Sequence, residues 1–230
     1  MSLNLLGFSR SALIALTAIS AGCASTDPVA YQGIASSKQL SVNTQNKDGK
    51  VPLLYSGGGV NFRAYSAVIV DPVEVYRGLD QQFGSTSDKN RIVLASYMKD
   101  TFEKRLKSKY TLTSIPGPAT LRLRLTLTGA KANAPVLSTA AKLMPVGLAV
   151  NSVQAARGKE GTLSGSVSYS VELYDSATNK LLLAYVSKQY PGALDVGASL
   201  GPLGASKVGI QKGADDLIGR LQPTMATSPQ

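Results

Sequence analysis

The chain has 230 residues, a length typical of one ordinary domain with extensions. It contains no histidine and a single cysteine, which excludes histidine catalysis, an intrachain disulfide and a cysteine-based zinc cluster. Lysine and arginine outnumber aspartate and glutamate by 24 to 14, and this net charge of +10 favours anionic partners.

Residues 1–22 have the architecture of a secretory signal peptide. A basic start that ends in Arg10 precedes a short apolar run, "SALIALTAIS", and small residues follow. The run is too short for a membrane span of ~20 residues. "SAGC", residues 20–23, resembles a bacterial lipobox, although Ser20 stands where leucine is usual. The resemblance implies that signal peptidase II cuts between Gly22 and Cys23, that Cys23 is lipidated, and that the protein is addressed to the outer membrane, facing the periplasm.

The next segment, residues 23–50, is polar and poor in bulky apolar side chains. Such a composition predicts a lipidated, flexible tether with little fixed structure, which would reach ~90 Å if fully extended. We therefore place the folded domain at residues 51–221 and a disordered tail at residues 222–230.

The first half of the domain predicts a strand, a helix and a second strand. Residues 64–76, "AYSAVIVDPVEVY", are rich in β-branched residues and predict a strand that Pro72 interrupts. The next segment begins with N-cap candidates in "STSDKN". Apolar residues then recur at steps of three and four, which predicts a helix with one buried face. In "TLRLRLTLTG", leucines alternate with Arg122, Arg124 and two threonines, which indicates a half-buried strand. The helix face consists of Ile92, Ala95, Met98, Phe102 and Leu106.

The second half predicts a hairpin and a final helix. Residues 135–153 are apolar almost all round and favour a buried helix, with contact to a membrane or partner as the alternative. Residues 160–190 alternate on both sides of "DSATNK" and predict a β-hairpin. A last amphipathic helix covers residues 205–221, with a stripe at Val208, Gln211, Ala214, Leu217, Ile218 and Leu221. Together these elements predict an α+β, two-layer sandwich: a mostly antiparallel sheet with helices packed on one face and the other face polar.

Several of these stretches resemble a family of Gram-negative bacterial lipoproteins of unknown function. They are "LLYSGGGVNFRAYSAVIVDPVEVY", the helix after it, "GPATLRLRLTLTGAK" and "SVELYDSATNKLLLA", which together span roughly residues 40–221. The family has a lipobox, a DPVEV segment and a D-x-x-T-G hairpin turn, in which Asn179 here replaces glycine. Because the family has no established activity, the resemblance implies location and fold type only.

Four patterns that could carry chemistry are better explained by structure. "SGGGV", residues 56–60, lacks the remainder of a phosphate loop and reads as a connector. Ser96 and Lys99 match the SxxK of penicillin-binding proteins, but no K[ST]G element accompanies them. The carboxylate pairs Asp71 with Glu74 and Glu172 with Asp175 are spaced to point to opposite faces of a strand, and Asp175 suits the start of a turn.

The sequence therefore favours an outer-membrane-anchored periplasmic lipoprotein with a binding or envelope-assembly role. We expect no catalysis, no cofactor and no metal; a hydrolase of envelope glycans or peptides is the alternative. The membrane is a partner through the N-terminal lipid, and nucleic acid is not, because the protein is exported. Arg122 and Arg124, within a basic stretch from Lys89 to Lys131, are the candidate site for an anionic envelope component or protein partner. A solvated surface is the simpler interpretation of that stretch.

Overall fold

The structure is a computed structural model that describes residues 27–132, 165–192, 195, 198 and 201–222. The signal peptide, Cys23, the predicted helix at residues 135–153 and nearly all of the predicted tail lie outside these ranges. Among the described residues, no helix is long and apolar enough to cross a membrane.

The centre of the fold is an antiparallel sheet of three long strands, β6 (Thr120–Lys131), β7 (Ser166–Asp175) and β8 (Leu181–Gln189). The four leucines of β6 from Leu121 to Leu127 are at most 1% exposed and all lie in the core, as their alternation predicts. The hairpin between β7 and β8 is confirmed, and Asn179 in its turn has a φ of 56°, a conformation that asparagine tolerates better than most residues.

Shorter strands extend this sheet on both sides. In the described ranges the order is β1-β2-β8-β7-β6-β3-β5, and β4 also pairs with β6. Strands β3, β4 and β5 run parallel to their partners, because the crossover through α1 leads from β3 and β4 to β5 and β6. The other pairs are antiparallel. The bounds are β1 Ser41–Val42, β2 Leu53–Ser56, β3 Ala67–Val70, β4 Glu74–Val75 and β5 Thr111–Leu112, with a short 3-10 helix at Phe62–Ala64.

Helix α1 spans Asp88–Leu106, and Ser87 is its N-cap residue. The Ser87 hydroxyl accepts a hydrogen bond from the Asn90 amide at 3.3 Å. Its buried face differs from the prediction at one position. Ile92 is 61% exposed, and Leu94 is fully buried in its place. Period alone did not fix the register of the first turn, because two apolar residues, Ile92 and Val93, precede Leu94. The buried residues of α1 are Leu94, Ala95, Met98, Phe102 and Leu106.

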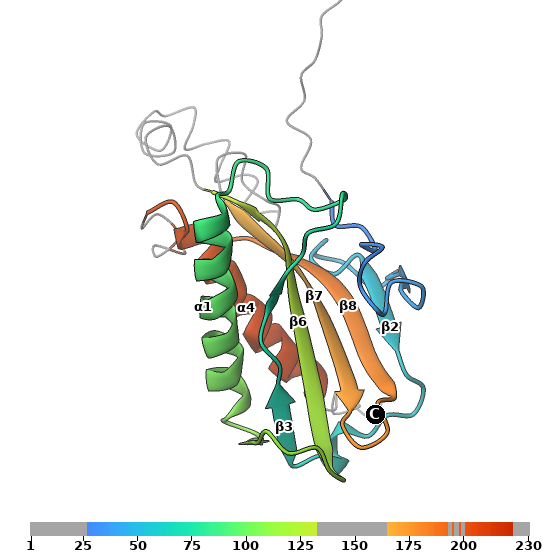
Figure 1. Cartoon of the computed structure of the whole chain (residues 1–230). Helices are drawn as coiled ribbons and strands as arrows, with labels where there is room; N and C mark the ends of the chain where they lie inside the picture. Colours follow the sequence, from blue (N-terminus) through green and yellow to red (C-terminus); the bar gives the residue numbers. More distant parts are fainter. Residues whose placement is uncertain (1–26, 133–164, 193–194, 196–197, 199–200, 223–230) are drawn as a thin grey trace, which may run out of the picture.

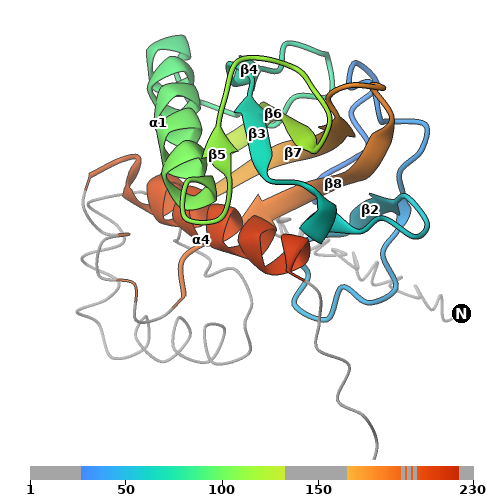
Figure 2. The same ribbon diagram turned by 90° about the horizontal axis from the view of Figure 1, so that it is seen from below.

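Helix α4 (Gly204–Leu221) packs beside α1, and both cover the same side of the sheet (Figures 1 and 2). The predicted stripe is correct at Ala214, Leu217 and Leu221 but wrong at Gln211, which is exposed. The residues buried instead include two glycines, Gly209 and Gly213. A Cβ at Gly213 would stand 1.6 Å from the Tyr169 hydroxyl oxygen, so the absence of a side chain lets the helix approach β7 closely.

The predicted fold class is confirmed: an α+β domain with a mostly antiparallel sheet, on one face of which the two described helices α1 and α4 pack. The other face is not simply polar and open. Thr126 is 8% exposed and Thr128 is fully buried, because residues 27–40 and the chain after β4 cover this outer face of the sheet.

The covering segment corrects the predicted tether. Tyr31 is 1% exposed and packs edge-on against Tyr76, with ring centroids 5.4 Å apart. Ile34 is also buried there, and Val186 of β8 completes the cluster. The amide of Ser36 donates a 2.7 Å hydrogen bond to Oε1 of Glu172 in β7. A few apolar side chains in a polar segment therefore hold residues 27–40 on the sheet, and the domain begins well before residue 51.

Candidate functional site

The break between β3 and β4 shapes the site. Pro72 lacks an amide hydrogen and cannot continue the ladder with β6, so the chain leaves the sheet after Val70 and rejoins it at Glu74. This break corrects the prediction that Asp71 and Glu74 point to opposite faces, because both residues line one cleft. The alternation rule applies only within a continuous strand.

Arg122 and Arg124 both reach Asp71 across the sheet. Arg122 forms a bidentate pair, with Nε at 2.8 Å from Oδ2 and Nη2 at 3.0 Å from Oδ1. The Asp71 carboxylate accordingly raises the pKa of Arg122 above its ordinary value. Arg124 makes a longer contact of 3.4 Å to Oδ2 and remains 45% exposed. Arg122 is therefore committed to the protein, whereas the Arg124 guanidinium is largely available.

Arg124 also lies over an aromatic ring that the sequence did not single out. Its guanidinium carbon is 4.9 Å from the ring centroid of Tyr174, which follows Ser170 and Glu172 on the outer face of β7. Burial raises the pKa of Tyr174 to about 12, and the neighbouring Glu172 carboxylate adds to the rise while Arg124 opposes it. Glu172 is 4% exposed and accepts the Ser36 hydrogen bond, so it joins the cleft to the covering segment.

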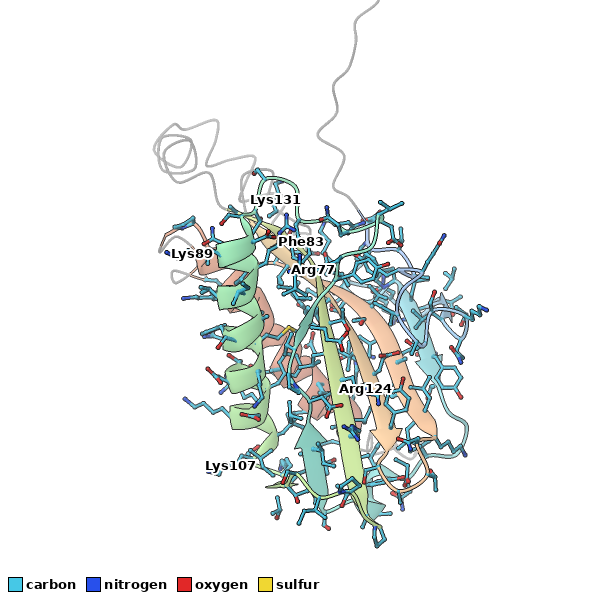
Figure 3. All side chains as sticks on the ribbon, in the orientation of Figure 1. Arg77, Phe83, Lys89, Lys107, Arg124 and Lys131 are labelled. Carbon is cyan, nitrogen blue, oxygen red and sulfur yellow. The ribbon has the colours of Figure 1, made fainter. Side chains whose placement is uncertain are left out.

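A cleft of about 650 Å³ lies on the outer face of the sheet, between the covering segment and the β3–β4 chain, and its lining includes Asp71, Arg122, Arg124 and Glu172. We call it the Arg124 cleft. Figure 3 shows two of its arginines, Arg77 toward the upper end and Arg124 beside the lower half of β6. Its formal charges balance, with three arginines against three carboxylates. The charged lining residues are Arg77, Arg122, Arg124, Asp71, Glu74 and Glu172.

The basic stretch from Lys89 to Lys131 does not form one patch. Arg91 pairs with Asp88, Lys99 with Glu103, and Arg105 with Asp215 of α4. Exposed ion pairs of this kind contribute little stability, but they reduce the local excess of positive charge. The simpler interpretation, a solvated surface, therefore fits the outer side of α1.

The SxxK match at Ser96 and Lys99, which the sequence does not support as a catalytic pair, lies on the surface of α1. Ser96 lies exposed on α1, and Lys99 is turned to Glu103 on the same helix. Neither residue lines the Arg124 cleft on the opposite side of the sheet.

Asp175 and the glycine run have structural roles, as expected. Oδ1 of Asp175 accepts hydrogen bonds from the amides of Thr178 at 2.8 Å and Ala177 at 3.1 Å, which lowers the pKa of the carboxyl and fixes the β7–β8 turn. The glycine run connects β2 to the 3-10 helix, with Gly59 at a φ of 70°. Strand β2 itself was not predicted.

The sequence did not reveal three features of the site: Tyr174, Arg77 and the covering segment. The alternation of β7 was enough to predict that Tyr174 lies on the outer face of the sheet. It could not predict the contact with Arg124, which lies about fifty residues away in the chain. Among the described residues, no three histidine, cysteine, aspartate or glutamate side chains cluster as metal ligands do. Gly22 and Cys23 lie outside the described residues, so cleavage and lipidation there stay predictions.

Comparison with known proteins identifies a family but no activity. The family model that matches residues 30–217 is described as a protein of unknown function, DUF3313. No curated protein matches the chain.

Comparison with solved structures finds matches of low similarity. The PelC dodecamer from Paraburkholderia phytofirmans has a TM-score of 0.38 at 10% identity, over 75% of this chain and 96% of that one. A hypothetical protein, CT253, from Chlamydia trachomatis has a TM-score of 0.35 at 14% identity, over 68% and 95%. A DUF4136 family protein from Bacteroides thetaiotaomicron has 0.36 at 10%, over 74% and 95%. With TM-scores this low, nothing about function is taken from these structures.

Proposed function

This chain belongs to the DUF3313 family of proteins of unknown function, and we propose that it is a lipoprotein of the outer membrane whose periplasmic domain binds a ligand in the Arg124 cleft. The lipobox with Cys23 supports the anchor. The cleft supports the binding role, because charged side chains from distant parts of the chain converge there in a hollow large enough for a small ligand.

The single observation that carries the binding role is the state of Arg124. Its side chain is 45% exposed, and its guanidinium makes only a 3.4 Å contact to Asp71 and lies over the Tyr174 ring. Arg122 already forms a bidentate pair with Asp71, so Arg124 can exchange its weak contact with Asp71 for a stronger one with a ligand. A planar guanidinium binds a carboxylate or phosphate through two parallel hydrogen bonds.

The balanced charge of the cleft disfavours ligands that carry several negative charges. A multiply charged anion would meet the carboxylates of Asp71, Glu74 and Glu172 at close range, and in a partly dry cleft this repulsion is strong. A ligand with one acidic group for Arg124 and one ammonium group for Glu74 meets no such repulsion. We therefore propose a zwitterionic ligand of peptide type rather than the purely anionic ligand that the sequence suggested.

The same contacts favour binding over the alternative of a hydrolase. Catalysis by two carboxylates needs one acid and one base that are free to act on the substrate. In the cleft, Asp71 is held by Arg122, and Glu172 is held by the Ser36 amide. Glu74 alone of the three has no such partner among the described contacts.

The test is calorimetric titration of the unlipidated chain from Ala24 onward. The probes are soluble stem peptides released from peptidoglycan, which carry both free carboxylates and free amines, and inorganic phosphate. We expect the peptides to bind and phosphate not to bind. Arg124→Ser should weaken peptide binding at least tenfold.

The matched control is Lys107→Ser, which removes the same charge from an exposed position beyond the end of α1 (Figure 3). Equal losses in the two variants would mean that overall charge and not the cleft attracts the peptides. Failure of the peptides to bind at all would refute the proposed ligand class. Shorter fragments appearing in the same incubations would favour the hydrolase.

A further inference from the structure

The start of the described chain is firmly attached to the domain. The carbonyl of Asp27 accepts a 2.9 Å hydrogen bond from Nε2 of Gln82, and the Gln82 side chain also accepts one from the Tyr31 hydroxyl at 2.9 Å. Pro28 is buried between these two contacts. Gln82 is itself fixed to β6 through a bridge to Gly129. The fold therefore holds the chain from Asp27 onward.

Only three residues, Ala24 to Thr26, separate Asp27 from Cys23. Four Cα–Cα steps span at most ~14 Å, even when the chain is fully extended. A lipid on Cys23 would thus keep the Asp27 end of the domain within ~14 Å of the lipidated cysteine at the bilayer surface, in contrast to the ~90 Å that the sequence alone predicted.

We propose that the domain stands on the phospholipid surface with one defined end, and this inference rests on the anchor proposed above. The contact surface, which we call the anchor end, consists of Val29, Arg77, Leu79 and Lys131. Figure 1 shows that the described chain begins at the same end of the molecule as the connection between β4 and α1. Figure 3 shows Arg77 and Lys131 at this end, whereas Lys107 lies at the other.

The chemistry of the anchor end fits a membrane interface. Leu79 is 107% exposed, on the loop that also carries Asp80, and Val29 is 43% exposed two residues after Asp27. A fully exposed leucine gains from burial among acyl chains or headgroup carbons. Arg77, two residues before Leu79 in the chain, is exposed, and so is Lys131, which Figure 3 places at the same end of the molecule; both suit lipid phosphates.

The acidic groups at this end do not oppose such a contact. Both oxygens of Asp80 are engaged, with the Tyr76 hydroxyl at 2.6 Å and the Gln32 amide at 3.1 Å. Asp88 pairs with Arg91 at 3.2 Å. Asp27 is exposed, and no hydrogen bond or ion pair among the described residues engages its carboxylate, so it is a carboxylate that the bilayer would meet directly.

The opposite end provides a matched reference position. Ile115 is 74% exposed, in the loop that leads to the start of β6. Strand β6 has 12 residues and ends at Lys131, which corresponds to a length of ~40 Å. A membrane at the anchor end therefore cannot touch Ile115.

The test supplies the anchor chemically, so that it does not depend on lipidation in cells. The chain from Cys23 onward, which contains every described residue, is coupled through its only cysteine to maleimide lipids in vesicles of phosphatidylethanolamine and phosphatidylglycerol. Because the chain has no tryptophan, Leu79→Trp and Ile115→Trp each introduce a single fluorescent reporter. Quenching by lipids brominated near the headgroup is then measured.

We expect quenching of the Leu79→Trp reporter to be at least threefold stronger than that of the Ile115→Trp reporter, with a blue shift for the former only. Equal quenching at the two positions, or none at either, would overturn the proposed orientation. Failure of the anchor itself would be seen separately, as the absence of palmitate labelling at Cys23 in cells.

Discussion

The close approach of α4 to β7 gives the sharpest test of the packing. In the substitution Gly213→Ala, the new Cβ would stand 1.6 Å from the Tyr169 hydroxyl oxygen and 2.7 Å from Cζ of the same ring. Tyr169 is fully buried and packs edge-on against Phe102, with ring centroids 6.0 Å apart. The ring therefore has no space into which it can turn.

Relief of the overlap requires the helix to move. Ordinary contact begins near 3.4 Å, so the pair must separate by 3.4 − 1.6 = 1.8 Å. A shift of this size would loosen the packing of Ile210 and Leu217, both fully buried on the same side of α4. Overpacking in cores usually costs 1–3 kcal/mol, and this overlap is at the severe end. The higher helix propensity of alanine offsets ~1 kcal/mol of this cost. We therefore expect the free energy of unfolding to fall by about 2 kcal/mol or more.

The assay is urea unfolding at equilibrium, with two other glycines of α4 as references. Nothing lies within 4 Å of a Cβ at Gly219, so Gly219→Ala should stabilise the protein by up to about 1 kcal/mol. A Cβ at Gly209 would be 2.8 Å from Cγ1 of Val167, and its substitution should fall between the two. The expected order of stability is Gly219→Ala, wild type, Gly209→Ala, Gly213→Ala.

A Gly213→Ala variant as stable as the wild type would refute this account of how α4 meets the sheet. The double variant with Tyr169→Phe offers a further check. Removal of the hydroxyl leaves Cζ at 2.7 Å, so the double variant should be less destabilised than the sum of the single variants but still less stable than wild type.

Three further predictions address the core and two titrating groups. Leu123→Ala, at a fully buried position, should lower the free energy of unfolding by about 2–5 kcal/mol, whereas Ile92→Ala, at an exposed one, should change it by less than about 0.5 kcal/mol; similar losses would contradict the observed face of α1. The hydrogen bond from Tyr76 lowers the pKa of Asp80, so the stability that Asp80 contributes is complete above pH ~4 and lost as the pH falls through its lower folded value. Asp80→Asn should flatten the acid limb of a stability–pH curve, and an unchanged limb would count against this role. Burial raises the pKa of Tyr174 to about 12, so the stability that Tyr174 contributes is complete below pH ~10 and lost as the pH rises toward 12. Tyr174→Phe should remove one tyrosine that titrates near pH 12 from the alkaline absorbance titration. Loss of a tyrosine that titrates near pH ~10 instead would contradict the burial of Tyr174.

The sequence alone determined the elements whose signal is local. The alternation of leucine with arginine and threonine in β6 requires only that one face be buried, and the strand, its inward leucines and its outward arginines follow from that. The β7–β8 hairpin is equally local, because Asp175 and Asn179 supply the turn chemistry within a few residues. From these elements the fold class could be predicted.

Only the tertiary structure decided which outward side chains meet. Arg124 and Tyr174 are adjacent because β6 and β7 pair in one register, and Asp71 joins them because Pro72 breaks the neighbouring strand. No short-range pattern encodes such contacts. Tyr31 likewise lies in a polar segment that resembles a tether, yet it is buried against Tyr76. Composition describes how much apolar surface a segment has, whereas the fold determines whether a complementary surface exists to bury it.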